Sequence, residues 1–548
     1  MRIAMFALSL SASLAVSLAV FADHPPNTDP RKAVAMDGLG PIRHPVSTKN
    51  AEAQKFFDQG LAFVYAFNHD EAVRSFRLAA ELDPDLAMAH WGIGLALGPN
   101  YNVDADSEAG KAAYAASRRA RALAENAPEQ EQAYIQALTK RYSTDSKADK
   151  KKLGRDYADA MKELVKRFPD DLDAATLYAE SLMNLQPWEL WTADGKPAED
   201  TPEILATLES VLRRNPDHTG ANHYYVHAVE ASPYPERGLP SANRLGALAP
   251  QAGHLVHMPS HIYLRIGDYA MAAAINAQAE AVDRAYIERF KVGGIYALMY
   301  FSHNMHFQAV AHANQGRYAD AKAAADRLAA HVGPFVKDVP MLEGFLPTPT
   351  LVLARFHRWD EILALPEPDA KLAIHSALGH FARGLAFAAT GKIEDAGKER
   401  DAFRKLRDGL PAEAMYGMRN RAADVLAVAS GMLDAQIALL GKDQAGAIKL
   451  LRDAAQAEDA LKYMEPKDWY IPVRETLGRL LLAGGDAAAG EQVFREDLGR
   501  NPRSGRSLLG LRESLKKQGK DYAAKQVDAL FDAAWKNAEP KALTLDDL

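Results

Sequence analysis

The sequence predicts an all-helical chain in which antiparallel helix pairs stack into a curved solenoid with a concave groove. Three observations favour this fold class. Alanine and leucine recur at helical spacing, whereas runs typical of strands are nearly absent. Glycines recur at a fixed interval, since Gly94 follows Gly60, and Gly519 follows Gly485, by 34 residues. Prolines placed to end the second helix of a pair also recur, at Pro169, Pro216, Pro250 and Pro502.

The first 22 residues differ from the rest of the chain. Arg2 is their only charge, and an apolar run leads through small residues to Ala22. We expect a signal peptide over residues 1–22, cleaved after Ala22. An uncleaved anchor is the alternative, but the run is short for a bilayer span. No other segment is apolar enough to span a membrane, so the mature chain is expected to be periplasmic or secreted.

Residues 23–50 are expected to form an extended lead-in, residues 51–535 the helical array, and residues 536–548 an acidic, loose tail. The first repeat begins at Ala53 and places small, packing and terminating residues at Gly60, Ala72, Phe76, Ala79 and Pro84. This arrangement and the 34-residue period resemble the tetratricopeptide repeat. Later glycines mark the turn into a second helix in the same way, at Gly267, Gly316, Gly391, Gly485 and Gly519.

Four longer blocks, "AHWGIGLALGPNYN", "QPWELW", "NHYYVHAVE" and "HMPSHIYLRIGDY", resemble secreted bacterial tetratricopeptide-repeat proteins with a histidine-rich groove. This resemblance implies the fold but no settled activity. One irregular insert, Asn184–Pro202, carries two of the six tryptophans. It is expected either to cover part of the inner surface or to be a structural loop with two buried rings.

Seven of the 17 histidines lie between His223 and His306. His257 follows His223 by 34 residues, and His261 follows His227 by the same interval. In the next repeat, His303 follows His254 and His306 follows His257, each by 49 residues. The histidines therefore form one stripe on successive first helices, and first helices line the groove in tetratricopeptide arrays.

Two carboxylates share this register. Glu230 lies three residues after His227, and Glu180 occupies the equivalent place one repeat upstream. Imidazole and carboxylate groups that converge from several helices are typical of a transition-metal site. The candidate ligands are Glu180, His223, His227, Glu230, His254, His257, His261, His303 and His306. Carboxylate ligands favour zinc or iron, and a nearly all-histidine shell favours copper.

Pro259 interrupts the histidine run, so the helix either kinks there or begins near it. We expect a kink, because the aligned stretches "HYYVH" and "HNMHF" have no proline. His90 is expected to be a packed first-helix residue beside Trp91. His312 lies off the stripe and is expected near the buried side of the groove. Four further histidines share no register with the stripe and are interpreted as structural: His331, His357, His375 and His380.

Composition excludes several classes of function. The chain has no cysteine, which removes thiol catalysis, thiolate metal sites and disulfides. Its formal net charge of −7 and lack of long basic runs argue against nucleic-acid binding. Phosphate-loop, nucleophile-elbow and H-E-x-x-H motifs are also missing. Two classes remain open. One is an exported protein with a histidine and carboxylate metal site, either a metal-dependent enzyme or a metal-handling protein; the other is a non-catalytic scaffold that binds a peptide or protein partner in its groove.

Overall fold

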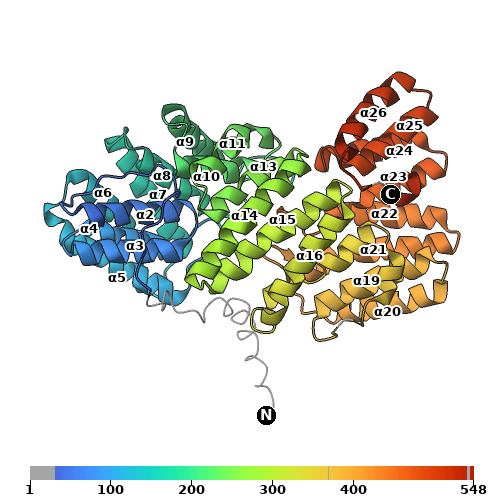
Figure 1. Cartoon of the computed structure of the whole chain (residues 1–548), viewed down its shortest axis with the longest axis horizontal. Helices are drawn as coiled ribbons and strands as arrows, with labels where there is room; N and C mark the ends of the chain where they lie inside the picture. The colour runs from blue at the N-terminus through green and yellow to red at the C-terminus, as the bar shows by residue number, and fades with distance from the viewer. Residues whose placement is uncertain (1–30, 368, 540–542) are drawn as a thin grey trace, which may run out of the picture. The chain divides into compact units, whose positions relative to one another are not determined.

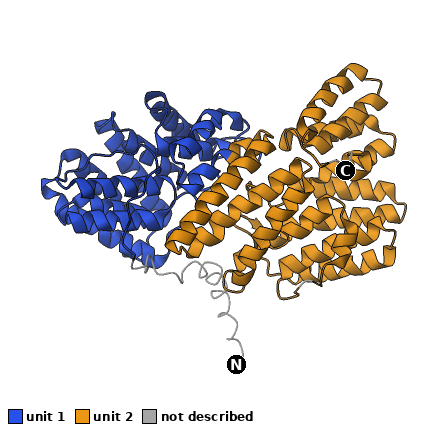
Figure 2. Cartoon of the chain, viewed as in Figure 1, with its two compact units in different colours: residues 1–259 blue, residues 260–548 orange. Residues whose placement is uncertain are grey.

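The computed structural model describes residues 31–367, 369–539 and 543–548. The predicted signal peptide, residues 1–22, lies outside these ranges. The chain divides into two compact units, residues 1–259 and residues 260–548 (Figure 2). Each unit is built from tetratricopeptide-like antiparallel helix pairs, which confirms the predicted fold class (Figure 1).

Unit 1 begins with residues 31–50, which form no helix or strand. Its elements are α2 (Ala51–Tyr65), α3 (His69–Leu82), α4 (Ala87–Ala96), α5 (Ser107–Leu123), η1 (Ala124–Asn126), α6 (Glu129–Leu138), α7 (Lys150–Arg167), α8 (Leu172–Met183), α9 (Thr201–Arg214), α10 (Thr219–Glu230), η2 (Pro235–Gly238), α11 (Leu239–Leu248) and α12 (Gly253–His257). Except for the short α12, the even-numbered helices are the first members of their pairs.

Unit 2 continues the same pattern after α13 (Pro259–Arg265), which starts at the boundary. Its elements are α14 (Tyr269–Phe290), η3 (Tyr296–Tyr300), α15 (Phe301–Asn314), α16 (Tyr318–Val332), η4 (Gly333–Phe335), η5 (Pro340–Phe345), α17 (Thr348–Arg355), α18 (Trp359–Ala364), α19 (Ala373–Ala389), α20 (Ile393–Asp408), β1 (Met415–Tyr416), β2 (Asn420–Arg421), α21 (Ala422–Leu440), α22 (Gln444–Asp459), α23 (Val473–Ala483), α24 (Ala487–Arg500), α25 (Gly505–Lys517), α26 (Asp521–Trp535) and η6 (Leu545–Asp547).

The turn between the two helices is built alike in the first pair of unit 1 and in the pairs of unit 2. A residue with positive φ follows the first helix, and the next residue is the N-cap of the second. Gly485 has φ +90°, and the Asp486 side chain then accepts a hydrogen bond from the backbone N–H of Ala489. Glycine adopts this conformation at little cost, which explains why it marks the repeat in the sequence. In the first pair, however, the same position is occupied by Phe67, with φ +53°.

Glycines also set how closely the helices approach. Phe76 of α3 is fully buried between Gly60 of α2 and Gly92 of α4, and a Cβ atom at Gly60 would lie 2.6 Å from its ring. The same arrangement recurs in unit 2, where Phe494 lies between Gly478 and Gly510. The aromatic side chain of the second helix therefore requires glycine on two first helices.

The first helices of unit 1 share an aromatic core. Phe57 of α2 lies 6.3 Å from Trp91 of α4, and Trp91 lies 5.3 Å from Tyr134 of α6, measured between ring centroids. Trp91 is thus a core residue. At the other end of the unit, α10 contacts both α8 and α2. This contact brings the end of α2 against the histidine-bearing helix.

One helix of unit 2 corrects an expectation about membrane spans. By length and composition alone, α21 (Ala422–Leu440) could cross a membrane. No such segment was expected after the predicted signal peptide. Its Val425, Leu426 and Leu433 side chains are instead fully buried in a hydrophobic cluster shared with α19 and α22. Helix α21 therefore has the packing of a core helix.

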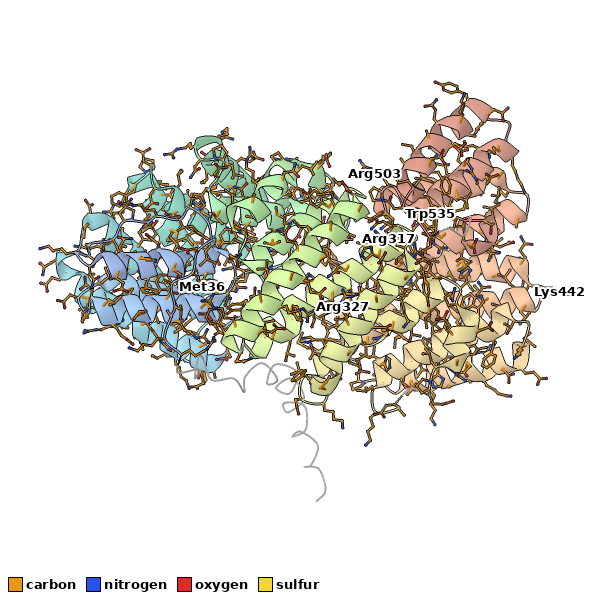
Figure 3. All side chains as sticks on the ribbon, in the orientation of Figure 1. Met36, Arg317, Arg327, Lys442, Arg503 and Trp535 are labelled. Atoms are coloured by element: carbon orange, nitrogen blue, oxygen red, sulfur yellow. The ribbon has the colours of Figure 1, made fainter. Side chains whose placement is uncertain are left out.

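The C-terminal residues pack more closely than a loose tail would. The ring of Trp535 lies against Gly316 and Gly505, where a Cβ atom would clash with it (Figure 3). Leu548 is 5% exposed and joins a cluster with Phe494, and its carbonyl oxygen accepts a hydrogen bond from Arg479 Nε at 2.9 Å. Trp535 is the last residue of α26, so within the predicted tail it is the apolar side chain of Leu548 that supplies the docking, which the acidic composition concealed.

Candidate metal centre

The structure brings three of the predicted ligands together inside unit 1. His223 and His227 lie on α10, and His254 lies on α12. One ring nitrogen from each can be chosen so that all three lie within 4.8 Å of one another. The three side chains are at most 4% exposed. Residues four apart on a helix share one face, so α10 presents both of its rings to α12.

The hydrogen bonds of His223 fix its tautomer. Its Nδ1 lies 2.7 Å from the backbone carbonyl oxygen of Tyr65, which can only accept, so Nδ1 carries the proton. In the neutral ring Nε2 then holds a lone pair, and it lies 3.1 Å from Nε2 of His254. A histidine that ligates a metal through one nitrogen commonly donates the other N–H to a backbone carbonyl in this way.

His227 is oriented by a carboxylate. Its Nδ1 lies 2.9 Å from Oε1 of Glu230, and both side chains are 1% exposed. An ionised carboxylate accepts hydrogen bonds, so Nδ1 again carries the proton and Nε2 carries the lone pair of the neutral ring. Glu230 was predicted as a metal ligand. In unit 1 it is placed behind His227 as the partner that orients the ring.

The distance between the ligand nitrogens of His223 and His254 is compatible with a shared transition metal. Two nitrogens bound to one tetrahedral zinc ion at about 2.0–2.1 Å are about 3.3–3.4 Å apart, and smaller angles bring them closer. The 3.1 Å between the His223 and His254 nitrogens is close to that range. Three neutral imidazoles with one further position are a known zinc set and also suit copper.

Phe67 covers the three histidines. Its ring stacks on His227 at 5.7 Å and on His254 at 5.6 Å, and it meets the edge of His223 at 4.5 Å. A bulky residue with positive φ is strained by about 1–2 kcal/mol, which glycine at this turn would avoid. The position of Phe67 over the rings explains why the strain is tolerated. Sequence reasoning missed this residue, although its place at a glycine position was a visible signal.

The tryptophan insert also reaches the histidines. Trp188 stacks on Tyr101 at 5.5 Å and lies 6.1 Å from His227, and Trp191 Nε1 donates to the carbonyl oxygen of Ala228 on α10. Of the two interpretations left open for the insert, the structure supports the covering one. Trp188 has φ +63°, so a second strained aromatic residue lies over the cluster.

The other candidates in unit 1 lie beside this group. His257 stacks on His254 at 6.0 Å. Glu180 is buried and accepts a hydrogen bond from Asn184 at 2.5 Å. Burial raises the pKa of Glu180, and the nearby Arg141 charge opposes that shift. Glu180 is therefore a buried carboxylate that is hydrogen-bonded to Asn184 and lies within the electrostatic influence of Arg141.

The remaining candidates lie in unit 2. His261 of α13 and His303 of α15 have ring centroids 5.9 Å apart. His261 Nδ1 also lies 3.8 Å from a carboxylate oxygen of Glu465, a residue outside the histidine register that sequence reasoning missed. His306 is buried against Phe345 and Tyr470.

His306 gives unit 2 a predictable pH response. Burial lowers its pKa to about 4, below the value of about 6.5 in an unfolded chain. As the pH falls, the unfolded chain binds the proton first. The stability that the neutral ring contributes is therefore present above about pH 6.5 and is lost towards pH 4. We expect His306→Gln to remove up to about 3 kcal/mol of the acid dependence of unfolding over this range, as measured by urea titration. An unchanged pH slope would contradict this assignment.

Helix α12 is separated from α13 by Met258 alone, and that residue remains in the right-handed helical region with φ −52° and ψ −35°. The Met258 N–H still donates to the carbonyl oxygen of His254, whereas Pro259 has no N–H to donate. One helix thus ends at His257 and another begins at Pro259, which is the alternative to the expected kink, and His254 keeps its helical geometry within α12.

A search against protein-family models found no match, and a search of curated proteins found none. Solved structures that align with the chain include a human IFIT1 dimer with m7Gppp-AAAA, at 13% identity over 89% of this chain and 91% of that chain, with a TM-score of 0.34. Yeast Tom70 aligns at 13% identity over 88% and 97%, with a TM-score of 0.30. The APC/C hetero-tetramer Cut9-Hcn1 aligns at 12% identity over 89% and 78%, with a TM-score of 0.29. These scores are low, and the fold assignment depends on the helix pairs themselves.

Proposed function

We propose that this tetratricopeptide-like scaffold binds one divalent transition metal, zinc or copper, through His223, His227 and His254. The observation that carries the proposal is the pair of fixed tautomers. Both rings of α10 direct their Nδ1–H away from the cluster, to Tyr65 and Glu230, and hold Nε2 lone pairs for a shared ligand. Core histidines that each form independent hydrogen bonds would not be expected to share this orientation.

Charge and burial support the same conclusion. A dication among three neutral imidazoles needs a nearby negative charge, and the Glu230 carboxylate lies behind His227. Phe67 and Trp188 border the rings with apolar surface, which strengthens electrostatic interactions inside. When bound, such a metal supplies Lewis-acid chemistry. The residues of the chain hold it, orient it and limit the access of water.

Glu230→Gln tests the orienting role. The amide is nearly isosteric but has no charge, so we expect zinc affinity to fall by about 10–100-fold, as outer-shell partners of ligating histidines typically cause. Titration of the metal-free full chain with zinc, copper and iron, by competition with a chromogenic chelator, measures this. Glu236→Gln, an exposed change six residues further along, is the matched control and should bind as the unchanged chain does.

A scaffold without metal is the competing function, because stacked helix pairs commonly bind peptides or proteins. The two functions give different titrations. If zinc, copper and iron all fail to bind stoichiometrically, the metal-binding function is excluded. The function of a metal-free scaffold then remains, and the three histidines are polar core residues.

We also propose that the chain is exported, on the strength of the charge and hydropathy pattern of residues 1–22. N-terminal sequencing of the natural protein should begin at Asp23, and the protein should be recovered outside the cytoplasm. A soluble pool that retains Met1 would contradict export.

A further inference from the structure

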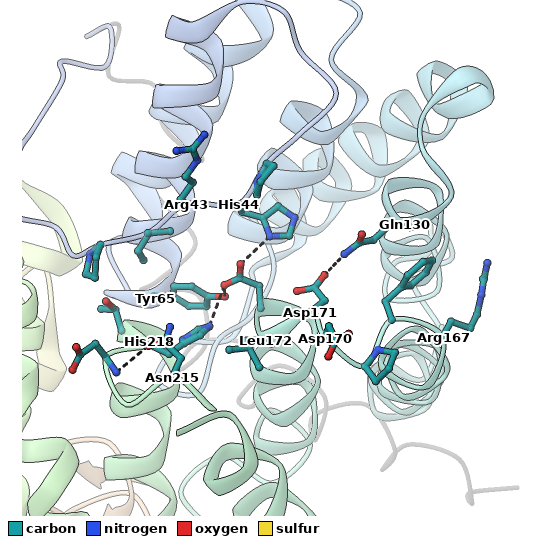
Figure 4. A pocket seen from close by; sticks show the side chains of 18 residues that line it. Arg43, His44, Tyr65, Gln130, Arg167, Asp170, Asp171, Leu172, Asn215 and His218 are labelled. Carbon is teal, nitrogen blue, oxygen red and sulfur yellow. Dashed lines mark hydrogen bonds and ion pairs between the residues drawn. The ribbon is translucent and has the colours of Figure 1, made fainter. Parts of the chain in front are cut away.

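A separate cavity of about 650 Å³ lies in unit 1, away from the three histidines (Figure 4). Its wall contains the extended segment around His44 and the starts of α8 and α10. Asp173, on the first turn of α8, also lines it. Its carboxylate accepts hydrogen bonds from His44 Nδ1 at 2.9 Å and from the Tyr65 hydroxyl at 2.5 Å, and His218 Nε2 lies 3.3 Å away.

The aspartate side chains of this wall already form hydrogen bonds or ion pairs with other residues of the chain. Asp171 caps α8 through the N–H of Ala174, and its other oxygen accepts from Gln130 and Tyr134. The side chains of Asp170 and Asp217 are exposed to solvent, and they pair with Arg214 and Arg244, respectively. Although His44, Asp171 and Asp173 are close enough to hold a metal, every carboxylate oxygen of the group accepts a hydrogen bond. A cation would have to displace these donors.

Only one of the two ring nitrogens of His44 is hydrogen-bonded to Asp173. Its side chain is 8% exposed and lines the cavity, and Nδ1 is used by Asp173. Nε2 makes no hydrogen bond with any residue that the structure describes. Burial lowers the pKa of His44, but the hydrogen bond and charge of Asp173 outweigh it and leave the pKa raised. The ring is therefore held as a donor, whereas His218 uses Nδ1 to cap α10 and directs Nε2 to Asp173.

Two helix N-termini add further donors. Helices α8 and α10 both begin at this wall, where Leu172, Asp173 and Thr219 line the cavity. The first backbone N–H groups of a helix have no partner within it, and the helix dipole places partial positive charge there. Arg43 is also on the wall, and its positive charge acts on Asp58 as well. The groups still available are thus donors and positive charges.

We propose that this cavity binds a ligand through a small oxyanion, a carboxylate or phosphate group, with His44 Nε2–H and the first amides of α8 and α10 as its donors. Asp173 is the residue that positions His44.

The test uses calorimetric titration of the full chain with inorganic phosphate and with acetate, against chloride at matched ionic strength. We expect saturable binding of at least one of them, and the one that binds identifies the class of ligand. His44→Asn places an amide where Nδ1 meets Asp173 but removes the nitrogen that faces the cavity. It should keep its melting temperature and lose affinity at least about tenfold, as expected for a hydrogen bond to a charged group.

His90→Asn is the matched control, because His90 lies on α4 and does not line the cavity. It should bind within about twofold of the unchanged chain. The proposal is overturned if neither anion binds saturably, if His44→Asn binds as tightly as the unchanged chain, or if His90→Asn loses as much affinity as His44→Asn.

Discussion

Replacing His223 with alanine is expected to abolish stoichiometric metal binding. His223 lies between its two neighbours, with ring centroids 4.9 Å from both His227 and His254. Removing it leaves two nitrogens, too few for a closed set, so the loss should exceed the roughly 10–100-fold typical of outer-shell changes. His254→Ala should have the same effect, since its Nε2 lies 3.1 Å from that of His223. Chelator competition measures the affinity, and the melting temperature of the metal-free variant checks the fold.

His375→Ala is the control for this experiment. His375 lies on α19 in unit 2, outside the histidine register, and should leave binding unchanged. Retention of full affinity by both His223→Ala and His254→Ala would place the metal elsewhere or exclude it.

Phe76→Ala is expected to destabilise unit 1 by about 3–5 kcal/mol, the usual cost of removing a fully buried phenylalanine. The ring fills the space that Gly60 and Gly92 leave between α2, α3 and α4, so its loss opens a cavity that rigid helices cannot close. Urea unfolding, followed by circular dichroism, gives the change in free energy.

Tyr234→Ala provides the comparison within the same unit. This side chain is 58% exposed, so its loss should change stability by no more than about 0.5 kcal/mol. If Phe76→Ala were equally mild, the packing of glycine against phenylalanine would not be what holds successive pairs together.

The fold could be predicted because its requirements are local. Gly60, Phe76 and Gly485 appear in the sequence as the close-approach, packing and turn residues that each pair needs, and the structure uses them so. The docking of Leu548 could not be predicted in this way. It depends on which apolar surface lies nearby in the folded chain, which spacing alone does not reveal.

The candidate site was predictable only in part. The 34-residue register led to His223 and His227, because equivalent positions on first helices face the same way. It did not reveal that Tyr65, at the end of α2, would supply the carbonyl that fixes a tautomer, since α10 meets α2 only in three dimensions. The register also did not distinguish the two predicted carboxylates. Glu230 contacts His227, whereas Glu180 lies near the charge of Arg141.

The central claim is tested most directly by elemental analysis of the full chain, purified without chelator and without a metal-affinity tag. The three-histidine centre predicts about one zinc or copper ion per chain, retained through gel filtration and lost in His223→Ala. Protein that carries no transition metal, and that neither takes up zinc, copper or iron nor gains thermal stability from them, would contradict the centre.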